Sequence, residues 1–259
     1  NPFDTSDRFN FAQFNLLLTP SERRGLYNQT HFEITDNTTW YFKGLYNERE
    51  STNQAAPEPI FLGPEAGTGN AYADNIFISR TNPYNPFGID FISTGPDANL
   101  VFFGRRPIEG GARVFNQEVD TWYIATGFEG NFDLGARKLY WDLNYANSQN
   151  KAEQTNYGSY NIRRIAQALG PVDACNADPN CVPLNYFGGQ GAGGGTITPE
   201  MLAYIQPIIR DSSEQELELY SANLTGDLFE LPAGALAFAA GYEYREYSGS
   251  YQPDALTVA

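Results

Sequence analysis

Apolar and polar residues alternate along three pairs of segments in this chain. In the first pair, residues 24–50, Leu26 and Phe32 lie at even positions, and most of the odd positions between them are polar. Such alternation is typical of a β-strand with one apolar and one polar face. Asp36 and Asn37 tolerate the backbone conformation of a tight turn, and the same alternation resumes after them. The pattern predicts a β-hairpin.

The same pattern predicts two further hairpins, over residues 112–150 and 216–247. In the second hairpin Trp141 and Leu143 alternate with polar residues, and residues 130–136 supply the turn. In the third hairpin the turn is the sequence Leu-Pro-Ala-Gly at residues 231–234. Six strands of about a dozen residues are therefore expected.

Two leucines interrupt the alternation in the third hairpin. Leu217 and Leu219 have the opposite parity from Leu224 and Leu228, so the four cannot share one face of a regular strand. The sequence predicts either a bulge or the entry of the strand into a membrane near Tyr220.

The connections differ strongly in length. The turns within the hairpins are short, whereas residues 51–111 and 151–215 form connections of about sixty residues. Short turns at one end and long loops at the other are typical of outer-membrane β-barrels, whose short turns face the periplasm. The sequence predicts an all-β fold, a fragment of a transmembrane antiparallel β-barrel. Its two long loops would be extracellular, and residues 1–23 would be the tail of another outer loop.

Composition agrees with a barrel wall. No apolar run reaches about 18 residues, so a transmembrane helix is excluded. The mean hydropathy of −0.44 is compatible with a barrel, because only alternate residues of each strand would meet lipid. The net charge of −15 argues against a nucleic-acid partner. Six strands would leave two edges unpaired in lipid, which predicts that the chain is a fragment.

Short motifs along nearly the whole chain resemble the barrel of TonB-dependent receptors of Gram-negative bacteria. The matching motifs are Phe9-Asn-Phe11, Asn15-Leu-Leu-Leu-Thr-Pro-Ser-Glu-Arg-Arg24, Gly44-Leu-Tyr-Asn47, Asn82-Pro-Tyr-Asn-Pro-Phe-Gly88, Cys181-Val-Pro-Leu-Asn-Tyr-Phe-Gly188, Ile197-Thr-Pro-Glu-Met-Leu202, Asn223-Leu-Thr-Gly-Asp-Leu-Phe229 and Leu231-Pro-Ala-Gly234. The resemblance implies a barrel of about twenty-two strands around an N-terminal plug. It also implies a location in the cell outer membrane and the import of a scarce nutrient with TonB-supplied energy.

The same resemblance implies the partners: outer-membrane lipid and lipopolysaccharide, the TonB complex, and a small-molecule nutrient such as a siderophore, haem, cobalamin or saccharide. The plug and the TonB-contacting segment are not in this sequence. Two alternatives stay open, a passive porin-like channel and a surface β-sandwich adhesin. The adhesin predicts strands of about five or six residues and shorter connections, which the pattern disfavours.

The second long loop carries signals for local order. Residues 161–169 predict a short helix, and Thr198 followed by Pro199 predicts the start of another that runs to about residue 205. Cys175 and Cys181 lie close together in a polar segment. A disulfide is the preferred interpretation for an exported protein, and a metal-binding pair is the alternative.

Candidate ligand contacts come from the first long loop. Tyr84 and Phe87 could stack on a cargo molecule, and Arg105 with Arg106 could receive a carboxylate or phosphate group. The alternative is that the aromatic rings pack among the loops and that the arginines pair with acidic neighbours or lipopolysaccharide phosphates.

The sequence offers no catalytic arrangement. His31 is the single histidine and has no partner pattern. Glu214, Glu216 and Glu218 share one face, and a polar strand face is preferred to a cation site. No enzymatic activity, resident cofactor or metal is expected.

Overall fold

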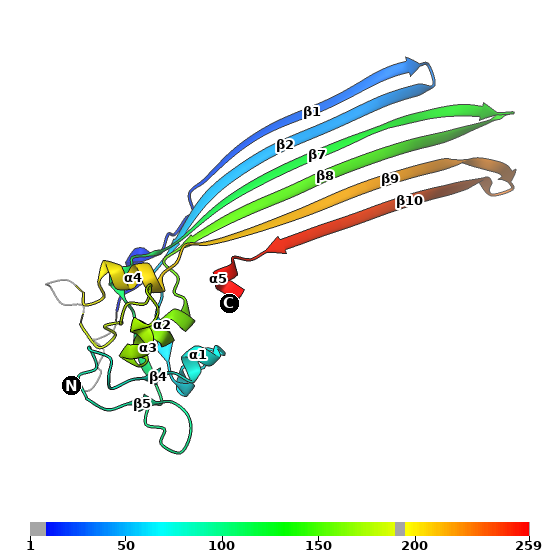
Figure 1. Cartoon of the computed structure of the whole chain (residues 1–259). Helices are drawn as coiled ribbons and strands as arrows, with labels where there is room; N and C mark the ends of the chain where they lie inside the picture. Colours follow the sequence, from blue (N-terminus) through cyan, green and yellow to red (C-terminus); the bar gives the residue numbers. More distant parts are fainter. Residues whose placement is uncertain (1–8, 190–194, 259) are drawn as a thin grey trace.

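The computed structural model describes residues 9–189 and 195–258, and a six-stranded antiparallel sheet dominates it (Figure 1). Within this sheet each strand pairs with the next strand that belongs to it, so the sheet is a simple meander in the order β1-β2-β7-β8-β9-β10, and the short strands pair separately as β3-β6 and β4-β5. In the described residues it is not closed, and β1 and β10 form its edges. The strands are β1 Ser21–Thr35, β2 Thr38–Ala55, β7 Arg113–Leu134, β8 Arg137–Tyr157, β9 Ile209–Leu231 and β10 Gly234–Gln252.

The three predicted hairpins are present, but their strands are longer than the alternation predicted. The strands contain 15 to 23 residues instead of about a dozen. Residues 130–134, predicted as part of a turn, belong to β7, and the turn is Gly135-Ala136. The hydrogen-bond ladder continues between segments that are polar on both faces, where no alternation marks a strand. The hairpins accordingly span Ser21–Ala55, Arg113–Tyr157 and Ile209–Gln252 instead of residues 24–50, 112–150 and 216–247.

Of the two explanations for the opposite parity of Leu217 and Leu219, the bulge is wrong. Pairing between β8 and β9 is continuous from the pair Leu139 and Gly226 to the pair Asn156 and Ile209. The irregularity of β9 lies nearer the turn, beside residue 228, where the register with β10 shifts. Residues 217 and 219 therefore keep their parity and lie on the same face as residues 45 and 123, because a continuous ladder fixes the face of each residue.

The two long connections fold together into one unit, which we call the cap (residues 56–112 and 158–208, as far as described). It lies at the end of the sheet opposite the tight turns (Figure 1). Its elements are β3 Ile60–Leu62, η3 Pro64–Ala66, α1 Ala71–Asp74, β4 Phe77–Ile78, β5 Phe91–Ile92, β6 Phe103–Arg105, η4 Ile108–Gly110, α2 Ile162–Leu169, α3 Val172–Asn176 and α4 Pro199–Ile205; η2 Ala12–Phe14 and α5 Ala255–Val258 lie outside these ranges.

The hydrophobic core of the molecule is in the cap. Both connections contribute to one cluster of buried side chains: Ile60, Leu62, Ala73, Ile76, Ile78 and Leu100 from the first, and Ile165, Ala168, Leu169, Leu184, Tyr186, Ile197, Met201, Tyr204 and Ile205 from the second. Burial of this apolar area stabilises the association of two segments that are far apart in the sequence. The cap is therefore an ordered unit.

The local signals for two cap helices are confirmed. The Asn161 side chain accepts a hydrogen bond from the Arg164 amide at the start of α2. The Thr198 hydroxyl accepts one from the Met201 amide at the start of α4, where proline occupies the first turn. None of the helices in the described ranges is long and apolar enough to cross a membrane.

Candidate functional site

One side of the sheet carries most of its large apolar side chains, and we call it the apolar face. The pairing register places one residue from each strand in a row across the sheet. A central row consists of Phe32, Trp40, Phe128, Leu143, Ala222 and Tyr242. The neighbouring row toward the cap consists of Thr30, Phe42, Thr126, Tyr145, Tyr220 and Tyr244.

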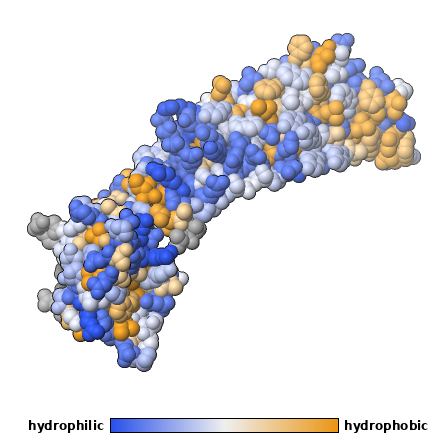
Figure 2. Space-filling view, in the orientation of Figure 1, coloured by the Kyte–Doolittle hydropathy of each residue, from blue (hydrophilic) through white to orange (hydrophobic). Residues whose placement is uncertain are grey.

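These apolar side chains have no cover within the described structure. The exposed fraction is 49% for Leu143 and 68% for Tyr242. Figure 2 shows hydrophobic residues gathered over the turn end of the sheet and hydrophilic residues over the half beside the cap. An exposed apolar surface that extends over several strands is uncommon on a soluble monomer and is typical of a surface that contacts another protein, a membrane or a ligand.

The apolar band crosses the strands obliquely. At its cap side it extends to Tyr46 on β2, but only to Tyr244 on β10, which is in register with Phe42. The limit thus shifts by four residues, or about 14 Å, across four strand spacings of about 4.8 Å each. At the turn side it shifts in the same direction, by six residues, from Trp40 to Leu236. Relative to the line perpendicular to the strands, the cap-side limit is therefore inclined by about 35° and the turn-side limit by about 47°.

Tyrosines mark the cap-side limit of this band, and their hydroxyls bond to carboxylates near it. Tyr220 donates to Glu218 at 2.8 Å, and Tyr244 donates to Glu246 at 2.9 Å. Each ring therefore lies in the apolar band while its hydroxyl reaches the polar zone beside the cap. This is the arrangement of aromatic residues at a boundary between an apolar and an aqueous phase.

The other side of the sheet is mostly polar, and we call it the polar face. A hydrogen-bonded network crosses its middle: Tyr41 donates to Asn144 at 2.5 Å, and Asn144 and Asn223 both donate to Asp142. His31 pairs with Tyr41 on this face and contacts Gln29. The alternation in the sequence predicted the polar positions Gln29, His31, Asp142 and Asn144, but not Tyr41 or Asn223. In the described residues no group of three or more His, Cys, Asp or Glu side chains could hold a metal ion.

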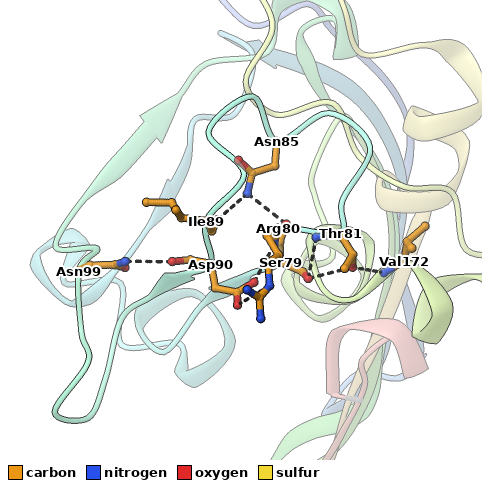
Figure 3. A network of polar contacts seen from close by, with 8 residues as sticks. All are labelled: Ser79, Arg80, Thr81, Asn85, Ile89, Asp90, Asn99 and Val172. Atoms are coloured by element: carbon orange, nitrogen blue, oxygen red, sulfur yellow. Dashed lines mark hydrogen bonds and ion pairs between the residues drawn. The ribbon is translucent and has the colours of Figure 1, made fainter.

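Tyr84 and Phe87 belong to the cap loop between β4 and β5. A network of polar contacts holds this loop in place (Figure 3). Asn85 donates to the carbonyls of Ser79 and Ile89, and Asp90 accepts from the Arg80 amide at 2.7 Å. The exposed fractions are 38% for Tyr84 and 63% for Phe87. Both side chains are therefore accessible on an ordered loop.

The network also joins this loop to the second connection. The Thr81 hydroxyl accepts from the Val172 amide at 3.1 Å (Figure 3). Phe87 packs edge-on against Phe91 and Phe187, with ring centroids 5.5 Å and 6.0 Å away. Packing among loop rings was the alternative to stacking on a cargo molecule. It covers part of the Phe87 side chain.

The two candidate arginines are occupied within the cap. The Arg105 side chain is 8% exposed, forms an ion pair with Glu109, and donates to the carbonyls of Asn185 and Tyr186 at 3.0 and 3.2 Å. Arg106 donates to the Pro57 carbonyl at 2.5 Å. Its guanidinium also lies over the Phe9 and Phe11 rings, and burial lowers its pKa. These contacts favour the interpretation in which the arginines pair with loop neighbours.

Cys175 and Cys181 form a disulfide in the structure, with 5.3 Å between their Cα atoms. The ring closed by this bond includes Asp178 and Asn180, which line a cavity of about 630 Å³ between the ring, α2, α4 and α5. Sequence reasoning missed this cavity. Its signals were the Arg163-Arg164 pair on a helix and the polar residues between the cysteines, but nothing in the sequence showed that they meet.

Comparisons of the chain with protein families, with curated proteins and with solved structures find no match.

Proposed function

We propose that this chain is part of the wall, and one section of the outer cap, of a β-barrel transporter in the outer membrane of a Gram-negative bacterium. The observation that supports it best is the oblique apolar band. Strands of outer-membrane barrels tilt by about 35–45° and carry an outward apolar band about 25 Å tall, flanked by aromatic residues. The slant of the band and its row of tyrosines match these properties, and the polar face would line the lumen.

The transport activity proposed is energised import of a small nutrient. Its support is the resemblance to TonB-dependent receptors, together with a cap that has its own core and could hold a binding site at the mouth. The cap would be extracellular, because it lies opposite the tight turns. A passive porin-like channel is the second candidate, since the same wall pattern fits both.

The lipid contact is tested by spin labels on adjacent residues of β8. In the intact protein reconstituted in lipid vesicles, a nitroxide at Leu143 should be relaxed by oxygen, which concentrates in lipid. A nitroxide at Asn144 should be relaxed by a water-soluble nickel chelate. The reverse pattern, or equal water access at both positions, would reject the assignment of the two faces.

The transport class is tested by removing the TonB system from cells. Uptake by an energised importer should stop, since a plugged lumen conducts no nutrient down its gradient. Uptake by a porin should continue at its original rate. Persistent uptake would therefore select the porin while leaving the placement of the wall in the membrane intact.

A further inference from the structure

We propose that the cap cavity of about 630 Å³ binds a neutral, polyhydroxylated ligand, specifically a short oligosaccharide. Its volume lies within the range of about 300–1,000 Å³ that is common for small-molecule sites. The inference rests on the proposed function in one respect, because it names the ligand class that a receptor cap would capture. The binding step itself requires neither a membrane nor TonB.

The charges that line the cavity balance. Arg163 and Arg164 come from α2, Asp178 comes from the disulfide ring, and Glu200 comes from α4. A ligand with a net charge would therefore meet repulsion as well as attraction. This balance separates the cavity from an anion site, in which cationic side chains outnumber acidic ones.

Several lining groups are held in position by each other. Gln167 donates to Asp178 at 3.1 Å and accepts from the Tyr204 hydroxyl at 2.9 Å. Arg164 donates to the Tyr204 carbonyl at 2.9 Å, and its guanidinium lies over the Tyr204 ring. Side chains that are already ordered lose little entropy when a ligand binds, which favours affinity.

Two exposed charged groups suit hydroxyls. Arg163 is exposed and forms no ion pair in the described residues. The Glu200 carboxylate is hydrogen-bonded to Thr198 but is exposed, so its other acceptor positions face the solvent. Guanidinium and carboxylate groups present two parallel donors or two acceptors, which match a pair of adjacent hydroxyls on a sugar ring. Ala203 and Leu256 add an apolar surface for the C–H face of such a ring.

The disulfide ring gives the site a fixed wall. The Asn180 amide donates to Asp178 at 3.0 Å, and this bond is the main reason that the pKa of Asp178 is lowered. Because Cys175 is buried in the cap and Cys181 packs against its core, the ring holds Asp178 against α2. We expect the bond to preserve the shape of the cavity.

The test is calorimetric titration of the intact protein in detergent micelles. The probes are linear gluco-, xylo- and manno-oligosaccharides of two to six units, with oligogalacturonates and neutral peptides of similar length for comparison. At least one neutral series should bind, and it should bind more tightly than either comparison class. Arg163→Ala and Glu200→Gln should each weaken that binding by about tenfold or more, since each removes a charged hydrogen-bonding group.

Arg80→Ala is the matched control. Arg80 is an exposed cap arginine outside the cavity, in a surface ion pair with Asp90 at 3.4 Å, and its removal should leave the titration unchanged. Since Arg163 and Glu200 are exposed, both variants should fold, and an unchanged circular dichroism spectrum checks this. The proposal is overturned if no neutral oligosaccharide binds, if the uronates or peptides bind more tightly, or if both cavity variants bind like the wild type. Such a failure leaves the lipid-contact and TonB tests unaffected.

Discussion

An arginine placed on the apolar face of β10 should destabilise the folded protein far more than one placed next to it on the polar face. Ala240 is the central residue of the apolar run Leu236, Phe238, Ala240, Tyr242 and Tyr244, so it lies near the middle of the band. The adjacent Ala239 points to the other face, because successive residues of a strand alternate. Both alanines are exposed in the described structure, so neither substitution removes a large packed side chain.

The expected magnitude follows from the depth of the site. If the band lies in lipid, Ala240→Arg puts a guanidinium near the bilayer midplane, at a cost of about 2–4 kcal/mol. This corresponds to a folding equilibrium constant lower by roughly 30- to 700-fold. Ala239→Arg puts the same group in an aqueous lumen, where the cost should be within about 1 kcal/mol of zero.

The assay is equilibrium unfolding of the intact protein from phospholipid vesicles by guanidinium chloride, with wild type and both variants measured under the same conditions. The difference between the variants carries the information, since the added side chain is identical. Equal free energies of unfolding for Ala240→Arg and Ala239→Arg, or a larger loss for Ala239→Arg, would refute the assignment of the apolar face to lipid.

Three further outcomes are expected. An epitope tag at Gly67 in the cap should bind antibody on intact cells, and a tag at Asp36 should do so only after the outer membrane is opened; surface labelling at Asp36 would invert the orientation. Leu169→Ala should lower the stability of the cap by about 2–5 kcal/mol, because Leu169 is fully buried in its core. Limited proteolysis of residues 56–112 should then accelerate, and unchanged protection would remove Leu169 from the core that joins the two connections. The carboxylate of Asp74 accepts hydrogen bonds from the amide and hydroxyl of Thr68, and mainly the hydroxyl bond lowers its pKa. This stabilisation is complete above the unfolded pKa of about 3.9 and is lost as the pH falls through the lowered folded pKa. The rate of amide exchange at residues 68–70, measured relative to the rate in Asp74→Asn, should therefore rise only below about pH 4.

The sequence by itself determined the strands and their faces. A strand repeats every two residues, so the alternation around Trp141 and Leu143 assigns each side chain to a face without any knowledge of its neighbours. The turns at residues 36–37 and 231–234 and the first residues of α2 and α4 were readable for the same reason, because turns and helix caps depend on residues a few positions apart. The sequence did not show where the strands end. Backbone hydrogen bonds extend the strands into polar segments, and these segments have no alternation of apolar and polar side chains.

Tertiary structure alone decided the slant of the apolar band, the cap and its cavity. The slant depends on the register of each strand with its neighbour, and these registers must be followed across the whole sheet. The cap core joins residues such as Ile60 and Tyr186, whose contact is the hydrogen bond from the tyrosine hydroxyl to the Ile60 carbonyl at 2.8 Å. Arg105 could be read as an anion receptor only until its burial beside Glu109 was known. Contacts between residues about a hundred positions apart arise from packing, and packing is a property of the assembled chain that no local spacing encodes.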